Sequence, residues 1–258
     1  MSKRNMELML FNELRTRKKM ELSEAIALLG VSESTVRRVF SKLEANKKVF
    51  RIHGGVKLIE ELSPDYSFET LVKDKFNEKM AIGRLALSAI SDGDVIYIDA
   101  GTTLLSFCIS IVESLKTDPI NIKIFTNSFV NLEILAAKIP VTVVGGDFRA
   151  NRKDFCGFIA EKTVSQLHFS KCFLGADGFK TAEGFTTTDF DTARLNQITI
   201  NHSDSTIILC DSSKFEKSSL VSNAKISQID TVFTDAGIRK EILEQFVNED
   251  VTVKIASI

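Results

Sequence analysis

The sequence lacks long apolar runs and closely spaced cysteines, and it has only three histidines. No run approaches the roughly 18 apolar residues that span a membrane, and the first residues reach an acid, Glu7, where a secretion signal needs its apolar stretch. The four cysteines lack the spacing of a zinc site or a redox dithiol, so we interpret them as reduced packing residues. These absences argue against a membrane or secreted protein. We expect a cytoplasmic protein without metal or cofactor.

Charge divides unevenly along the chain. The 258 residues allow one or two domains, and 44% apolar with 26% charged residues is ordinary for a packed protein. Residues 1–59 hold thirteen Lys/Arg against six acids, or +7, whereas the remainder holds 20 against 28, or −8. A basic N-terminal segment (the basic head) on an acidic remainder (the acidic body) favours an anionic partner for that segment. A basic surface that faces solvent and has no partner would give the same charge distribution.

The basic head has the spacing of three helices. The first is expected at about Lys3–Arg17, and the second follows Ser23 as its cap and stops at Gly30. Ser32 is a suitable N-cap for the third. In that helix Val36, Val39, Phe40 and Leu43 form one apolar stripe, so the opposite face is free to touch a partner.

Two helices joined by a short turn through a glycine predict a helix-turn-helix that enters the DNA major groove. The segments 48–53 and 56–59 flank Gly54-Gly55, which predicts a hairpin wing. A helical bundle for protein contact and an RNA-binding module remain alternatives. The candidate DNA-binding residues are Ser32, Ser34, Thr35, Arg37, Arg38, Ser41, Lys42, Arg51, His53 and Lys57.

Strand-like and helix-like segments alternate through the acidic body. This alternation predicts an α/β domain with a mostly parallel, Rossmann-like sheet covered on both faces. The expected strands are 95–99, 122–127, 141–146, 172–175, 206–211, 231–235 and 251–256. The expected helices between them include 80–90, 104–115, 128–137, 191–202 and 238–248.

Small and polar residues follow the ends of five expected strands. In open α/β sheets ligands bind at that edge. Gly101-Thr102-Thr103 precedes a helix and can hold a phosphate, although such a triplet is as often only an N-cap. Lys214 and Arg149 would add positive charge, and the acids could bond sugar hydroxyls. The candidate effector-binding residues are Asp99, Gly101, Thr102, Thr103, Thr126, Asn127, Gly145, Gly146, Arg149, Gly175, Asp177, Gly178, Asp211 and Lys214.

The head resembles the DNA-binding domain of the DeoR family of bacterial transcription repressors. The resemblance rests on residues 31–38, on Leu43-Glu44 and on residues 51–55. Asp92-Gly93-Asp94, residues 99–103, 126–128, 145–146, 173–178, 184–187 and 211–215 extend it to the family's effector-sensing domain. The resemblance implies a phosphorylated sugar or related metabolite as inducer, and a sensor fold akin to ribose-phosphate isomerases and coenzyme A transferases.

The sequence departs from the family pattern at three places. The family usually has Asp at the position of Val39, Gly at the position of Lys47, and a Lys-Arg pair where this chain has Asn196-Gln197. The last difference bears on which ligand is held or how its signal is transmitted.

We therefore expect a DNA-binding repressor of a carbohydrate-metabolism operon and not an enzyme. The expected parts are a winged helix-turn-helix domain at 1–59, a linker at 60–77 and an effector-sensing domain at 78–258. Its expected partners are double-stranded operator DNA, a phosphorylated sugar, and further copies of itself in a homodimer or homotetramer. The alternative is an isomerase-like enzyme with an accessory nucleic-acid-binding domain.

Overall fold

The computed structural model describes residues 6–7, 9–10, 13–14, 17, 19–45, 49–52, 54–58, 67–117 and 119–257, without the side chains of residues 45, 50, 57 and 58. The chain divides into two compact units, Met1–Asp65 and Tyr66–Ile258. The division falls inside the segment 60–77 that the sequence analysis assigns to a linker, and the ends of that linker stay a prediction.

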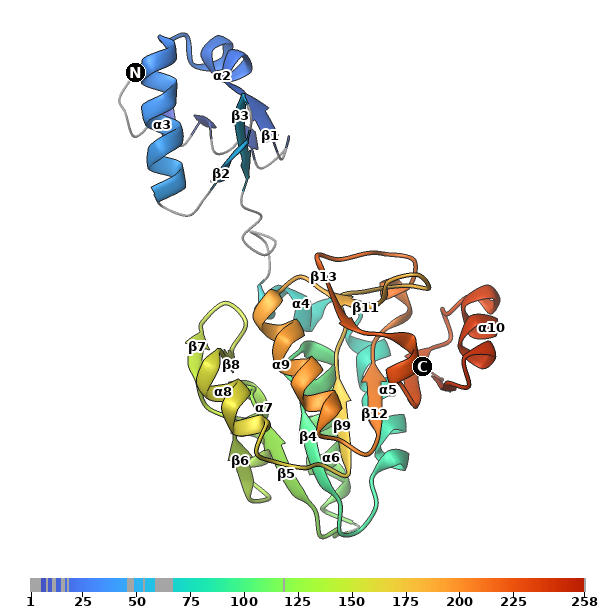
Figure 1. Ribbon diagram of the computed structural model, residues 1–258. Helices are drawn as coiled ribbons and strands as arrows, with labels where there is room; N and C mark the ends of the chain where they lie inside the picture. The colour runs from blue at the N-terminus through green and yellow to red at the C-terminus, as the bar shows by residue number, and fades with distance from the viewer. Residues whose placement is uncertain are drawn as a thin grey trace. The chain divides into compact units, whose positions relative to one another are not determined.

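The smaller unit packs helices on a three-stranded antiparallel sheet (Figure 1). The described residues between 6 and 17 are helical, followed by α2 (Leu22–Leu29) and α3 (Glu33–Ala45). The sheet has the order β1 (Lys19–Glu21), β3 (Gly55–Leu58), β2 (Val49–Ile52). Its core includes Leu10, Leu14, Val36, Phe40 and Val56.

The start of α2 differs from the sequence expectation. Strand β1 leads directly into the helix, so Glu21 is the cap, and its backbone N–H donates to the Glu24 carboxylate at 2.7 Å. Ser23 lies inside the first turn, and its assignment as the cap was wrong. The end of α2 is as expected, because Gly30 adopts the left-handed conformation and donates to the Ile26 carbonyl at 2.9 Å.

The hairpin of β2 and β3 is confirmed, and β1 extends it by an unexpected strand. A Cβ atom at Gly55 would lie 2.2 Å from the carbonyl oxygen of Met20 in β1. Gly55 is therefore needed for the close approach of β1, whereas the sequence suggested only a turn.

The larger unit is built on a seven-stranded sheet in which every ladder is parallel. All seven expected strands are present in it. The strand order is β15 (Thr252–Ala256), β14 (Thr231–Asp235), β12 (Thr206–Leu209), β9 (Lys171–Leu174), β4 (Val95–Ile98), β5 (Lys123–Thr126), β6 (Val141–Val143).

Helices cover both faces of this sheet, because side chains on its strands alternate between two cores. Phe173 and Leu209 point to the face covered by α5 (Phe76–Ala86), α6 (Thr102–Ser114) and α7 (Phe129–Leu135). Leu174 and Ile208 point to the other core, shared with α8 (Phe158–Val164), α9 (Phe190–Asn201) and α10 (Lys240–Asn248). Figure 1 shows α9 in front of the sheet and α6 behind it.

Several short elements were not expected from the sequence. They are α8, the hairpin β7 (Asp147–Arg149) and β8 (Asp154–Cys156), and a small antiparallel sheet of β10 (Gly178–Lys180), β11 (Gly184–Thr187) and β13 (Val221–Ala224). Helix α4 (Phe68–Lys73) lies in the second half of the connecting segment 60–75, where the sequence allows a helix. Three- and four-residue strands carry too little periodicity to be found locally. The hairpin and α4 matter most, because both contribute to the site below.

Candidate functional site

The outer face of α3 carries the side chains expected to meet DNA. Ser34, Arg37, Arg38, Ser41 and Lys42 are exposed, while the apolar stripe of the helix is buried. At the N-terminus, the Ser32 hydroxyl lies 3.1 Å from each of the hydroxyls of Ser34 and Thr35. This face therefore offers hydroxyls at the helix start and two adjacent guanidinium groups in its first two turns, the groups that bond phosphates and guanine edges.

Two of the basic side chains on this face form ion pairs with acidic side chains. The Arg37 guanidinium bonds Glu33 at 2.7 Å, and the Lys42 ammonium bonds Glu7 at 2.7 Å. Exposed ion pairs contribute about 0–1 kcal/mol. Phosphates can therefore displace these acids.

Arg51 lies against α3 instead of extending from the hairpin. Its Nη2 donates to the Arg37 carbonyl at 3.1 Å and to the Ser41 hydroxyl at 2.8 Å, and its guanidinium carbon lies 5.5 Å from the centre of the Phe40 ring. It also faces Glu44 at 3.5 Å. Arg51 thus fixes β2 to the helix. His53 and the side chain of Lys57 lie outside the described residues.

The larger unit has a pocket at the point where its strand order reverses. From β4 the chain proceeds outward through β5 and β6, then returns to β9 on the other side of β4 and continues through β12 to β15. The loops after β4 and β9 diverge there, which is where open α/β sheets bind ligands. The pocket is lined by Leu71, Asp99, Ala100, Gly101, Thr102, Thr103, Leu104, Arg152, Asp154, Gly175, Ala176, Asp177, Thr187, Thr192, Leu209 and Lys214.

One side of this pocket carries positive charge. Helix α6 begins at Thr102, so the positive end of its dipole lies at the pocket, and Thr102 and Thr103 are among the lining residues. Lys214 lines the same pocket from the turn after β12, and Arg152 lines it from the β7–β8 hairpin. A helix N-terminus with two cations is a suitable place for a phosphate group.

Three acids line the pocket beside these cations. The Asp177 carboxylate is held by the hydroxyls of Thr187 and Thr188 at 3.0 Å and by the Thr188 N–H at 2.9 Å. Asp154 is paired with Arg149. Asp99 is fully buried, and burial raises its pKa to about 7, although the amide of Asn196 opposes the change.

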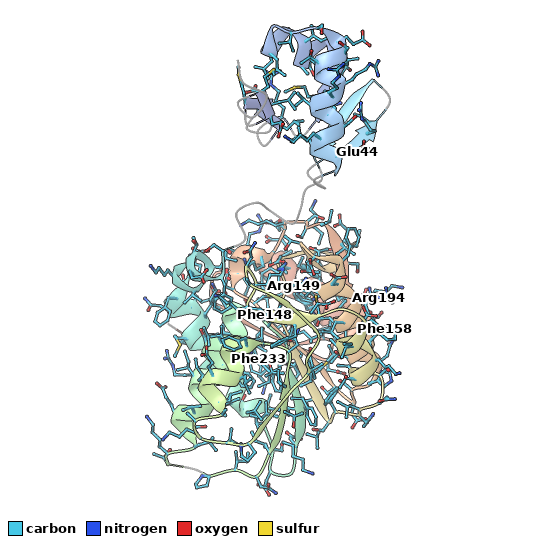
Figure 2. The ribbon with its side chains drawn as sticks, turned by 90° about the vertical axis from the view of Figure 1, so that its left-hand side faces the viewer. Glu44, Phe148, Arg149, Phe158, Arg194 and Phe233 are labelled. Atoms are coloured by element: carbon cyan, nitrogen blue, oxygen red, sulfur yellow. The ribbon has the colours of Figure 1, made fainter. Side chains whose placement is uncertain are left out.

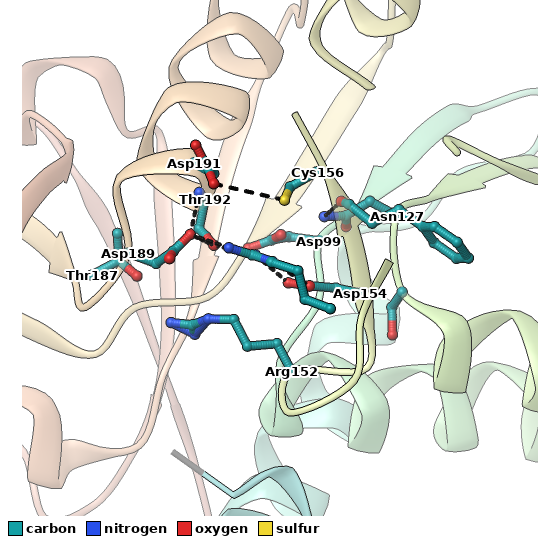
Figure 3. Close-up of polar contacts among 12 residues, drawn as sticks. Asp99, Asn127, Arg152, Asp154, Cys156, Thr187, Asp189, Asp191 and Thr192 are labelled. Carbon is teal, nitrogen blue, oxygen red and sulfur yellow. Dashed lines mark hydrogen bonds and ion pairs between the residues drawn. The ribbon is translucent and has the colours of Figure 1, made fainter. Parts of the chain in front are cut away.

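Arg149 holds the hairpin to the start of α9. Its guanidinium takes Asp154 in two hydrogen bonds of 2.8 and 2.7 Å, and it also bonds Asp189 and the Thr192 hydroxyl (Figure 3). Burial lowers the pKa of Arg149, but the hydrogen bonds and charges of the two acids outweigh it and raise the pKa. Arg149 is therefore engaged by protein acids and does not line the pocket.

Arg152 is the cation that the sequence analysis missed. It follows β7 in the turn of the hairpin, is largely buried, and donates to the Thr188 hydroxyl at 2.7 Å. Figure 3 shows Arg152 and Asp154 on the hairpin. The nearby Gly145-Gly146 pointed to this region of the sequence, but only the pairing of β7 with β8 brings Arg152 to the pocket.

Seven predicted effector-binding residues line the pocket, and seven do not. Those that line it are Asp99, Gly101, Thr102, Thr103, Gly175, Asp177 and Lys214. Those outside its lining are Thr126, Asn127, Gly145, Gly146, Arg149, Gly178 and Asp211. Several of these hold neighbouring backbone: Thr126 donates to the Ile98 carbonyl at 2.7 Å, and Asn127 donates to the Phe155 carbonyl at 3.2 Å.

The described residues show neither a metal centre nor a membrane span. No group of three or more His, Cys, Asp or Glu is arranged for a metal ion in the part of the chain that the structure describes. Within the same residues, no helix combines the length and apolar character needed to cross a membrane. The four cysteines are free and buried.

Comparison with known proteins gives matches to two family profiles. Residues 8–62 match the DeoR-like helix-turn-helix domain, and residues 74–236 match the DeoR C terminal sensor domain. An uncharacterised HTH-type transcriptional regulator FruR of Bacillus subtilis is 31% identical over 91% of this chain and 91% of its own. A lactose phosphotransferase system repressor of Lactococcus lactis is 30% identical over 87% of this chain and 88% of its own.

Among solved structures, ribose 5-phosphate isomerase A from Methanocaldococcus jannaschii is similar over 55% of each chain. The TM-score is 0.42 and the sequence identity 16%.

Proposed function

Because the chain belongs to the DeoR family of transcriptional regulators, we propose that it represses carbohydrate-metabolism genes under the control of a phosphorylated sugar or related metabolite. The smaller unit binds operator DNA through α3, and the pocket between the loops after β4 and β9 binds the effector. The observation that carries this proposal is the pocket itself, where a helix N-terminus and two cations stand beside three acids at the strand-order switch. Such a set suits a phosphate joined to a polyol.

The relatives support the regulatory role. One similar protein is named for transcriptional regulation and another as a repressor of a lactose phosphotransferase system. Neither is named as an enzyme, so the isomerase-like alternative finds no support among them. A carbohydrate-related effector agrees with the lactose repressor, and a regulator of this kind acts in the cytoplasm.

Helix α4 contributes to the pocket wall. Leu71 of α4 lines the pocket, and Glu69 pairs with Lys153 of the hairpin at 3.6 Å. The buried Lys79 ammonium donates to the carbonyls of Leu71 and Asp74 at 2.7 Å. A ligand that moves α4 therefore moves the first helix of the larger unit. The effector must bind one conformation of the protein more tightly than the other, because a ligand with equal affinity for both does not change their populations.

We expect the protein to form a homodimer or homotetramer, because α3 alone offers a single short helix to the DNA. One short helix in one groove gives limited affinity, and linked copies reach two half-sites at high effective concentration.

A thermal-shift screen of the full chain against sugar phosphates tests the proposal. A true ligand at 100 times its dissociation constant adds about 2.7 kcal/mol of stability. The same ligand should change the affinity of the protein for an operator selected from a random duplex library. The double variant Thr102→Val with Lys214→Ala should keep operator binding and lose the response to the ligand. If the ligand still changed the operator affinity of this variant, the pocket would not be the effector site.

A further inference from the structure

The two carboxylate oxygens of Asp99 have different surroundings. Oδ2 accepts a hydrogen bond from the Asn196 side-chain amide at 3.0 Å. Oδ1 has no hydrogen-bond partner among the described residues, although the side chain is only 2% exposed and Asp99 lines the pocket. A buried acceptor without a partner costs about 1–3 kcal/mol, and more when it is charged. A ligand that offers a donor removes this penalty.

The fixed partner of Asp99 is a neutral amide and not a cation. Asn196 is fully buried in α9, and its amide also donates to the Asn223 side chain at 3.0 Å. Asn223 in turn donates to the Gly175 carbonyl at 2.9 Å. This network joins α9, β13 and the loop after β9 beneath the pocket, and it fixes the carboxyl group without neutralising it.

No cation pairs with Asp99 among the described residues, and besides the Asn196 amide only the backbone N–H groups of Ala100 and Gly175 favour its ionised form. Asp154 on the hairpin adds negative charge, but Arg149 binds that acid in two hydrogen bonds. Tyr97 on β4 is fully buried, burial raises its pKa well above the usual value, and its hydroxyl has no hydrogen-bond partner among the described residues. Arg152 and Lys214 line the same pocket.

We propose that Asp99 Oδ1 receives a hydrogen-bond donor of the effector, a hydroxyl or an amino group near the phosphate, and that Asn196 positions it. This inference rests on the proposed function of the pocket. Asp99 and the start of α6 belong to one loop, so the donor and the phosphate belong to one small molecule. The effector class is a phosphorylated polyol or amino sugar. Analogues that lack the donor, or carry a carbonyl acceptor there, are rejected.

The contact predicts how affinity depends on pH. A donor favours the ionised carboxylate, so binding lowers a pKa that burial has raised to about 7. Affinity should therefore rise between pH 5.5 and pH 8. The second ionisation of the phosphate, near pH 6, acts in the same direction. The variant Asp99→Asn removes the first contribution and keeps the second, and thus separates them.

The test is isothermal titration calorimetry of the full chain between pH 5.5 and pH 8. The probes are glucose 6-phosphate, 2-deoxyglucose 6-phosphate, glucosamine 6-phosphate, ribose 5-phosphate, 2-deoxyribose 5-phosphate and inorganic phosphate. For the tightest sugar phosphate, Asp99→Asn should lower the affinity about 10- to 100-fold at pH 8. The loss should be smaller at pH 5.5, and binding of inorganic phosphate should change little. Hydroxyl and amino donors are distinguished by the glucose and glucosamine compounds.

Two further variants complete the design. Asp204→Asn makes the same change at a surface acid paired with His168, outside the pocket lining, and should bind like the unchanged protein. Asn196→Ala releases Oδ2 and should shift the midpoint of the pH profile, which a merely structural residue would not do. If Asp99→Asn did not fold, the dependence of effector affinity on pH in Asn196→Ala would still test the inference, and an unshifted midpoint would overturn it.

The outcomes separate this inference from the function on which it rests. Equal affinity of Asp99→Asn and the unchanged protein at pH 8 overturns the inference and leaves the pocket as an effector site. An affinity that falls with rising pH overturns it as well, because protonated Asp99 would then be the donor. No binding of any phosphorylated probe overturns both.

Discussion

Single side chains determine what each unit can recognise. On α3, Arg37 is paired with Glu33, whereas the neighbouring Arg38 is exposed on the same outer face. In the larger unit, the buried Asp99 accepts a hydrogen bond from the neutral Asn196 amide on Oδ2, while Oδ1 has no hydrogen-bond partner among the described residues. An exposed cation can meet a base edge, and a buried acid makes stability depend on pH.

The first prediction concerns Arg38. Replacing it by Ala should weaken specific operator binding by about 1–3 kcal/mol and relax specificity at one base position, because a guanidinium bonds guanine bidentately. Fluorescence anisotropy with the selected operator and with single-base variants measures both effects. Arg84→Ala, an exposed arginine of α5, is the control. Unchanged affinity would exclude Arg38 from the interface.

The second prediction concerns Asp99 and stability. Its folded pKa of about 7 lies above the usual 3.8, so the folded state holds its proton more tightly than the unfolded state. Stability is therefore lost as pH rises from about 4 through 7. The variant Asp99→Asn avoids this loss. The difference between its free energy of unfolding and that of the unchanged protein should therefore grow over that range to roughly a few kcal/mol and then level off. Urea unfolding at a series of pH values measures it, and a difference independent of pH would contradict the assignment.

Among the elements, the β7–β8 hairpin is the one that completes the pocket. Arg152 and Asp154 line the pocket from this hairpin, and Arg149 fixes the hairpin to α9 through Asp154 and Asp189. The two acids are almost fully buried. Three-residue strands stabilise little by themselves, so the arginine holds this wall of the pocket in place.

The third prediction tests this role of Arg149. The variant Arg149→Met leaves two buried carboxylates without their cation, which should reduce the free energy of unfolding by about 3–5 kcal/mol. Calorimetric unfolding measures the change. The triple variant Arg149→Met, Asp154→Asn, Asp189→Asn should recover part of the loss, since it leaves no buried charge unpaired. A loss below 1 kcal/mol in the single variant would show that the hairpin is held by other contacts.

At the scale of the whole molecule, charge is unevenly distributed along the chain. The first 59 residues carry +7, and the rest carries −8. A packed cluster of Phe179, Phe185, Phe215 and Phe246 supports the small sheet of the larger unit. Figure 2 labels three exposed side chains of the larger unit, Phe148, Phe158 and Arg194.

The fourth prediction follows from this charge distribution. DNA binding by the full chain should weaken as salt rises, with a linear plot of log affinity against log salt concentration, because phosphate contacts release counterions. Lys42→Ala should reduce the magnitude of that slope by about 1 per head and weaken binding to all duplexes alike. Anisotropy titrations between 50 and 200 mM salt provide the slope. An unchanged slope would place Lys42 outside the phosphate contacts.

The sequence by itself determined the helix-turn-helix, the seven strands of the large sheet and the edge that carries the pocket. Each depends on local periodicity, on caps or on glycines that follow strands, which neighbouring residues define. The stripe from Val36 to Leu43 and the loop from Asp99 to Thr103 were found in this way.

Only the tertiary structure decided which residues meet. Asn196 reaches Asp99 across 97 positions, Arg149 reaches Asp189 across 40, and Gly55 is required by a strand that begins at Lys19. Such contacts depend on how distant segments pack, and no local pattern encodes them. The same reason explains why Arg149 was predicted to face the effector, whereas the structure pairs it with two acids and places Arg152 in the pocket wall.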